Sequence, residues 1–113
     1  MNIREATKND CVHMDALLTK LIRYETRFDP NLSPEVVIED NYAGQIAAEG
    51  SKAYVAEDHG IIVGYLYGFT YRIPQVLLQP IAIVDALYVE EGYRGKGIAK
   101  DLFRRFQEFA SGC

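Results

Sequence analysis

The stretch from Ile81 to Ala110 constrains the fold more than any other part of the sequence. Its apolar run Ile81–Val89 has the length of a buried strand and ends at Glu90-Glu91-Gly92. A glycine-rich segment, Arg94–Ala99, follows directly. The sequence therefore predicts a strand, a turn and a helix from about Gly97 to Ala110, with helical apolar spacing at Ile98, Leu102, Phe106 and Phe109.

A turn of this composition suits an anion. The first turn of a helix carries N–H groups without an intrahelical partner, together with the positive end of the helix dipole. Gly95 and Gly97 have no Cβ, so the backbone can turn sharply and approach a phosphate, while Arg94 and Lys96 add positive charge. We expect a phosphate or pyrophosphate ligand here.

Two common phosphate-binding motifs fail against these residues. A dinucleotide fingerprint G-x-G-x-x-G from Gly95 needs glycine or alanine where Lys100 stands, and a P-loop from Gly92 needs lysine and serine or threonine where Ile98-Ala99 stands. The pattern R-x-x-G-x-A, Arg94 to Ala99, does match. It resembles the acetyl-CoA-binding signature Q/R-x-x-G-x-G/A of the GNAT superfamily of N-acetyltransferases. For these six residues alone, a plain strand-to-helix connection is an equal alternative.

The resemblance implies an acyltransferase that moves an acetyl group from its co-substrate acetyl-CoA to a primary amine of a small molecule or protein, by direct attack. It implies an α/β fold with a mixed, mostly antiparallel twisted sheet. Main-chain groups at the bulged end of the fourth strand, Leu87, Tyr88 and Val89, would pair with pantetheine. The turn that holds the pyrophosphate would be formed by Arg94, Gly95, Lys96, Gly97, Ile98 and Ala99.

The rest of the chain predicts elements in the order of that fold, β-α-α-β-β-β-α. A short strand at 3–6 precedes a capping-box spacing at Thr7 to Asp10 and a helix from about residue 9 to 24. Ser33-Pro34-Glu35 predicts the start of a second helix that runs to Glu49. The runs 53–57 and 61–69 predict a hairpin, in which Gly64 and Gly68 suggest close packing or bulges.

Composition narrows the class of protein. With 113 residues, 49% of them hydrophobic, we expect one domain, and a net charge of −4 gives no general basic surface for nucleic acid. No apolar run is long enough to span a bilayer, so a cytoplasmic protein without membrane contact is expected. Cys11 and Cys113 predict neither a disulfide framework nor a metal site. Positive charge is local, around the expected phosphate site: Arg94, Lys96, Lys100, Arg104 and Arg105.

Acetyl transfer to an ammonium group needs a proton acceptor, and Asp85 is the candidate catalytic base. It lies inside an apolar strand, where burial would favour its neutral form, and two residues before the expected bulge. The alternative is that Asp85 hydrogen-bonds the backbone or pairs with an arginine. Glu57 is a weaker second candidate for the base, whereas Glu90 and Glu91 suit an exposed turn.

The resemblance covers residues 1–113 as a single domain that is incomplete at its C-terminus, because the family continues with strands that build the other wall of the cofactor slot. This chain alone would then be inactive, and its last strand would have an open edge. That edge, or the apolar loop Ile73–Pro80, suits a contact in a homo-oligomer. A non-catalytic acyl-CoA-binding or interaction module is the alternative function, and generic nucleotide binding is a third.

Overall fold

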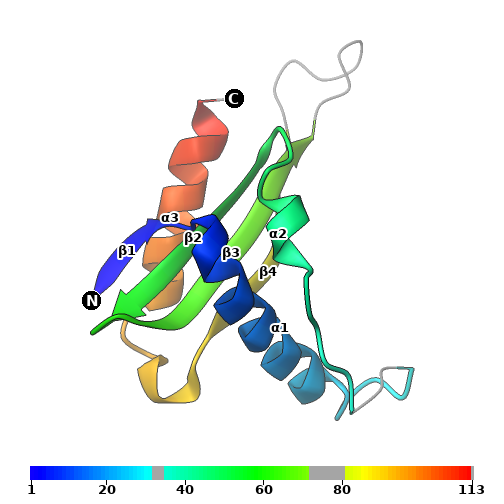
Figure 1. Cartoon of the computed structure of the whole chain (residues 1–113). Coiled ribbons are helices and arrows are strands. Elements are labelled where there is room, and N and C mark those ends of the chain that lie inside the picture. Colours follow the sequence, from blue (N-terminus) through cyan, green and yellow to red (C-terminus); the bar gives the residue numbers. More distant parts are fainter. Residues whose placement is uncertain (32–34, 72–80, 113) are drawn as a thin grey trace.

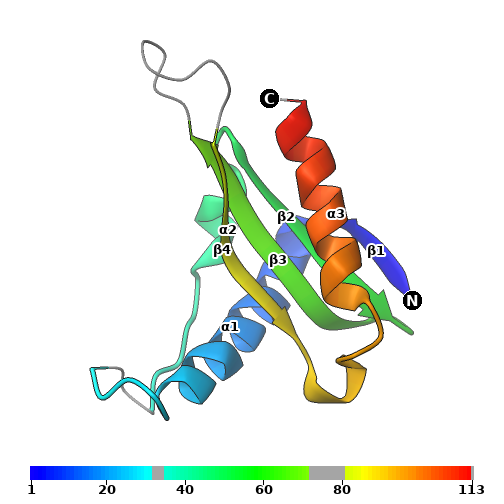
Figure 2. The same ribbon diagram turned by 180° about the vertical axis from the view of Figure 1, so that it is seen from behind.

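The computed structural model describes residues 1–31, 35–71 and 81–112. Within these residues the strands β1 (Asn2–Glu5), β2 (Ser51–Asp58), β3 (Ile61–Tyr71) and β4 (Ile81–Val89) form one four-stranded sheet in the order β1-β2-β3-β4. Every neighbouring pair is antiparallel. Figure 1 shows helices α1 (Cys11–Glu25) and α2 (Tyr42–Gln45) on one face, and Figure 2 shows α3 (Ile98–Ser111) on the other. The expected mixed α/β fold with an antiparallel sheet is confirmed.

Each face of the sheet has its own apolar core, because side chains alternate between the faces along a strand. On the α1/α2 face, Met14 and Leu17 of α1 pack with Tyr42 of α2 and with Val55, Tyr65 and Tyr67 of the sheet. On the α3 face, Leu102 and Phe106 pack on Leu66 and Val89. The helical spacing of apolar residues in α3 therefore predicted its buried side correctly.

Gly68 sets how closely α3 approaches the sheet. A Cβ built on this residue would lie 2.5 Å from Cζ of Phe106 and 2.7 Å from the carbonyl oxygen of Ile83. No other residue fits without movement of the backbone or the ring. The close packing that the sequence suggested at Gly68 is thus present, and at Gly64 a Cβ would lie 3.0 Å from the carbonyl oxygen of Tyr88.

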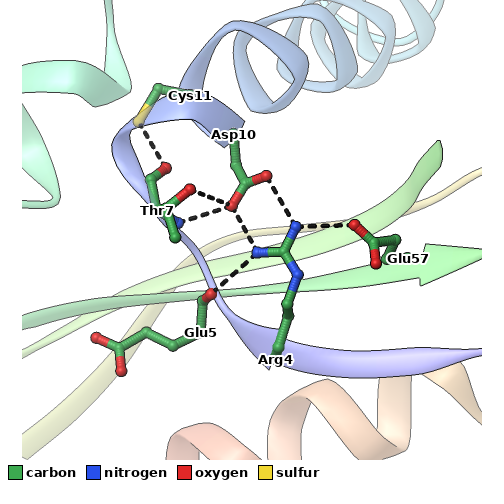
Figure 3. A network of polar contacts seen from close by, with 6 residues as sticks. All are labelled: Arg4, Glu5, Thr7, Asp10, Cys11 and Glu57. Carbon is green, nitrogen blue, oxygen red and sulfur yellow. Dashed lines mark hydrogen bonds and ion pairs between the residues drawn. The ribbon is translucent and has the colours of Figure 1, made fainter. Parts of the chain in front are cut away.

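The predicted capping box begins the first helical segment (Figure 3). The carboxylate of Asp10 accepts the main-chain N–H of Thr7 at 2.7 Å and its hydroxyl at 3.0 Å. A short 3-10 turn, η1 (Lys8–Asp10), leads into α1. Arg4 of β1 binds the same carboxylate and reaches Glu57 of β2 at 2.9 Å. This network ties the first strand, the second strand and the first helix together.

The predicted second helix is wrong over most of its described length. Only Tyr42–Gln45 is helical, and the chain from Glu35 to Asp40 is irregular, while Ser33 and Pro34 lie outside the described residues. Three α1 side chains hold this segment: Arg23 Nε donates to the Val36 carbonyl at 2.9 Å, Thr19 Oγ1 accepts from Ile38 N at 2.9 Å, and Asp15 accepts from Tyr42 N. These tertiary bonds, along with the β-branched Val36, Val37 and Ile38, outweigh the local cap signal.

One hairpin turn and one bulge in the sheet matter for the site. The hairpin between β2 and β3 turns at His59 and Gly60, which have φ of 51° and 80°. In the β3–β4 pair, Tyr67 faces Ala86 but Gly68 faces Val84, so Asp85 is the extra residue of a β-bulge. The bulge therefore lies at Asp85 and not at Leu87–Val89, where we expected it.

Candidate active site

The turn between β4 and α3 has the geometry of an anion site. After β4 the chain makes a 3-10 turn, η2 (Glu91–Tyr93), and then reaches Gly95 with φ of 79° and Gly97 with φ of 82°. Both values lie in the left-handed region, which glycine adopts without strain. Within the described ranges, no main-chain or side-chain acceptor receives a hydrogen bond from the N–H groups of residues 95–99. These groups are available at the first turn of a fourteen-residue helix.

The Arg94 and Lys96 side chains contact neighbouring residues of the protein and help to fix the conformation of the turn. Arg94 Nε donates to the Val89 carbonyl at 2.8 Å, and its guanidinium lies 5.4 Å from the centre of the Tyr88 ring. Lys96 Nζ lies 5.5 Å from the centre of the Tyr93 ring, and the Tyr93 hydroxyl donates to Asp58 at 2.7 Å. That bond raises the pKa of Tyr93 and lowers the pKa of Asp58. The turn is therefore anchored to the β2–β3 hairpin.

Fewer cationic side chains lie near the turn than the sequence suggested. Lys96 and Lys100 are exposed beside the turn. Arg105, in contrast, donates to the Ile3 carbonyl at 2.9 Å and lies over the Tyr54 ring, while Arg104 lies 3.8 Å from Asp101 on α3. Arg105 thus belongs to the packing of α3 against the sheet, and the cations near the turn are those of Arg94, Lys96 and Lys100.

Most of the other candidate cofactor-binding residues have side chains that pack in the protein core, so a cofactor could contact mainly their main-chain groups. Leu87 packs in the core on the α3 face, Val89 is buried there, and Ile98 is 5% exposed with its side chain in the same core. Tyr88 packs against the core on the α1/α2 face. Ala99 is exposed at the start of α3. In the sheet order β4 is an edge strand, so among the described residues its outer edge is unpaired.

Asp85 is exposed, contrary to the burial that would favour its neutral form. Within the described part of the chain, its carboxylate has no hydrogen bond and no ion pair, so neither of the structural alternatives, a backbone contact or an arginine, is found there. Burial is the main reason that the pKa values of Tyr42 and Tyr65 are raised, and the negative charge of Asp85 adds to this effect.

The carboxylate of Glu57, the second candidate base, forms an ion pair. It accepts from Arg4 Nη2 at 2.9 Å in the network of Figure 3. Glu90 pairs with Lys20 at 2.7 Å and thereby joins α1 to the end of β4. Of the two residues considered as the base, Asp85 and Glu57, only Asp85 has a carboxylate without a partner among the described residues.

The sequence reasoning missed the Tyr42–Tyr65 pair. The two hydroxyl oxygens are 2.9 Å apart in the core on the α1/α2 face of the sheet. Tyr65 and Tyr67 alternate along β3, and this period of two was visible in the sequence as a tyrosine-rich face. Nothing local pointed to Tyr42, because the extended segment that delivers it depends on contacts with α1.

The sequence of this chain matches a known protein family. Residues 49–113 match the family described as "Acetyltransferase (GNAT) domain". The chain belongs to the GNAT acetyltransferase family. Members are N-acetyltransferases, so this protein is one by family, and the match includes β2, β3, β4, the glycine turn and α3.

Solved GNAT structures agree with this fold. An acetyltransferase from Vibrio fischeri has a TM-score of 0.80 at 24% identity, over 99% of this chain and 88% of that chain. A ribosomal-protein-alanine N-acetyltransferase from Brucella melitensis biovar Abortus has a TM-score of 0.71 at 25% identity, over 98% and 72%. The aminoglycoside N-acetyltransferase AAC(6')-Iy in complex with CoA has a TM-score of 0.72 at 17% identity, over 98% and 71%. It was also solved with the bisubstrate analogue CoA-S-monomethyl-acetylneamine.

No helix in residues 1–31, 35–71 or 81–112 combines the length and apolarity needed to cross a membrane. The same ranges contain no cluster of three or more histidine, cysteine or acidic side chains arranged to hold a metal ion.

Proposed function

We propose that this GNAT protein binds acetyl-CoA at the turn of residues 94–99 and transfers the acetyl group to a primary amine. The proposal depends on the N–H groups of residues 95–99, which have no acceptor in the described part of the chain and follow from two left-handed glycines at the start of α3. A diphosphate needs several donors that converge on its oxygens, and a helix start supplies them together with a positive dipole. The residues present therefore fit the diphosphate of CoA.

Side-chain charge supports the same ligand. Lys96 and Lys100 are exposed beside the turn, and Arg94 is held over Tyr88 by its bond to Val89. Fixed cations next to main-chain donors stabilise a polyanion more strongly than mobile ones, because less side-chain freedom is lost on binding. The remainder of the protein is acidic, with a net charge of −4, so this turn is a local site and not part of a basic surface.

The pantetheine arm would lie along β4. The outer edge of this strand is unpaired among the described residues, and an extended amide chain can add to such an edge by main-chain hydrogen bonds. In this conformation the Val89 carbonyl already accepts from Arg94. Glu90 N bonds the Val63 carbonyl of β3, so by the alternation of an antiparallel ladder Tyr88 also bonds β3, and Leu87 directs its main-chain groups to the outer edge. The arm would then run from the turn toward the bulge at Asp85.

Asp85 has the position and the chemistry of the base. Bound acetyl-CoA supplies the acetyl group as a thioester, while the protein must take a proton from the acceptor ammonium. A carboxylate that has no partner among the described residues can attract that ammonium and then accept its proton, directly or through a water. We therefore assign a cationic primary amine as the acceptor class. The complex of AAC(6')-Iy with an analogue joining CoA to acetylneamine supports an amine acceptor for a protein of this fold.

Calorimetric titration with CoA tests the cofactor site. We expect binding at micromolar to low-millimolar concentration, weakened by salt because the diphosphate contacts are ionic. Release of free thiol from acetyl-CoA across a panel of small amines and amine-bearing peptides then tests transfer. Absence of CoA binding at high concentration would reject the proposal. Binding without turnover on any amine would favour a non-catalytic acyl-CoA-binding module.

A further inference from the structure

Tyr93 joins the turn of residues 94–99 to the hairpin between β2 and β3. Its hydroxyl donates to Asp58 Oδ2 at 2.7 Å, and Asp58 is the last residue of β2. Figures 1 and 2 show the turn and the hairpin at the same end of the sheet. A hydrogen bond to a carboxylate is charge-assisted and stronger than one between neutral groups. The bond therefore links two segments that are 35 residues apart in sequence.

The other hydrogen bonds of this part of the chain are local. Among the described residues, those of residues 91–97 reach only the end of β4, the adjacent turn or the start of α3: Arg94 Nε to the Val89 carbonyl, Tyr93 N to Glu90, Arg94 N to Glu91 and Asp101 N to the Gly97 carbonyl. In the same ranges, Tyr93 thus supplies the hydrogen bond that connects the turn to a different pair of strands.

Asp58 is itself held in place from the hairpin side. Its other oxygen, Oδ1, lies 3.0 Å from Nδ1 of His59. Asp58 pairs with Ile61 across the hairpin, and the chain reverses at His59 and Gly60 with φ of 51° and 80°. A two-residue reversal of this kind fixes the register of the strands that it joins. The acceptor of the Tyr93 bond is therefore attached to an ordered part of the sheet.

The ring of Tyr93 makes a second contact, next to the proposed ligand. Lys96 Nζ lies 5.5 Å from the centre of this ring, within the range of a cation–π interaction. The ring also packs against the apolar core on the α3 face. One side chain thus restricts both the backbone of the turn and an exposed cation beside its N–H groups.

A turn with two glycines gains from such restriction. Gly95 and Gly97 give the backbone more conformational freedom than other residues would, and the freedom that a ligand removes lowers its affinity. A turn that already has its binding conformation has less freedom to lose on binding.

We infer that Tyr93 is a positioning residue for the diphosphate of CoA, because its bond to Asp58 holds the N–H groups of residues 95–99 in one orientation before the ligand binds. The inference rests on the function proposed above and adds a residue to it. Tyr93 does not touch the reacting atoms in this role. Its removal should therefore weaken cofactor binding and leave the chemical step unchanged.

The first test removes the Tyr93 hydroxyl and keeps the ring. In Tyr93→Phe, the affinity for CoA by calorimetry should fall about five- to tenfold, and KM for acetyl-CoA should rise by a similar factor at unchanged kcat. Asp58→Ala should show the same loss. The double variant should lose no more than either single variant, because both changes remove the same bond. The matched control is Tyr67→Phe, whose hydroxyl bonds Ser51 at the opposite end of β2, and it should bind CoA as the wild type does.

Nitrogen-15 NMR relaxation gives a second readout that needs no turnover. Backbone order parameters of residues 94–99 in the free protein should be lower in Tyr93→Phe than in the wild type and in Tyr67→Phe. Because coupling between two sites is reciprocal, CoA should raise the order parameters of residues 58–61 in the wild type and not in Tyr93→Phe.

Unchanged CoA affinity and order parameters in Tyr93→Phe would overturn the inference. Additive losses in the double variant, or an equal loss in Tyr67→Phe, would do the same. A wild type that binds no CoA would instead refute the proposed function, while the order parameters of the free protein would still decide whether Tyr93 fixes the turn.

Discussion

Arg4 donates two hydrogen bonds to the carboxylate of Asp10, at 2.8 and 3.0 Å. The same carboxylate caps the start of the first helical segment through Thr7, so one acidic side chain joins β1 to α1. Chiefly through the bond from Arg4, the pKa of Asp10 is lowered from 3.8 to about 2. The contribution of Asp10 to the free energy of unfolding therefore depends on pH.

Asp10 should stabilise the fold above pH 4 and lose this effect in acid. A carboxyl group whose pKa is lower in the folded state contributes fully above its unfolded value, and the contribution disappears as pH falls from about 4 to about 2. We expect Asp10→Asn to cost about 2 kcal/mol at pH 7 and much less near pH 2. Urea unfolding at both pH values measures the difference. The control Asp101→Asn, at an exposed 3.8 Å pair, should change little at either pH.

Gly68→Ala should destabilise the protein through crowding against α3. The new Cβ would meet Phe106 at 2.5 Å and the Ile83 carbonyl at 2.7 Å, and the second of these is backbone that cannot simply rotate away. Overpacking of this kind costs about 1–3 kcal/mol. Gly44→Ala is the matched control, because nothing lies within 4 Å of its Cβ. Thermal unfolding that ranks the two variants equally would contradict this account.

Local signals predicted the part of the fold that carries the cofactor turn. The strand Ile81–Val89 has the bounds that its apolar run indicated, and α3 begins one residue after Gly97, because the glycine break and the helical spacing lie next to each other in sequence. The Thr7–Asp10 cap is local in the same way. The extended segment before Tyr42, the Tyr42–Tyr65 bond and the position of the bulge depend on partners distant in sequence. No short window of sequence contains them, and the loop Ile73–Pro80 lies outside the described residues.

Gly97→Ala should impair CoA binding more than it impairs folding. With φ of 82°, an alanine here would strain the backbone by about 1–2 kcal/mol, and relief of that strain would turn the neighbouring N–H groups away from a shared ligand. We expect an affinity loss of about tenfold or more by calorimetry. Gly92→Ala, in the preceding turn and with open space around its Cβ, should bind as the wild type does.

Asp85→Asn should separate chemistry from cofactor binding. The amide is nearly isosteric with the carboxylate but cannot take the proton of the acceptor, and loss of a general base lowers the rate by about 10²–10⁴. Because Asp85 has no partner in the described residues, the substitution breaks no contact there, and stability and CoA affinity should stay near their wild-type values. Steady-state kinetics should show the loss in kcat as well as in kcat/KM. Glu57→Gln serves as the contrasting variant: its carboxylate binds Arg4, so it should lower the free energy of unfolding and leave kcat unaltered. If Asp85→Asn kept full activity while Glu57→Gln lost it, the base would have to be sought at Glu57.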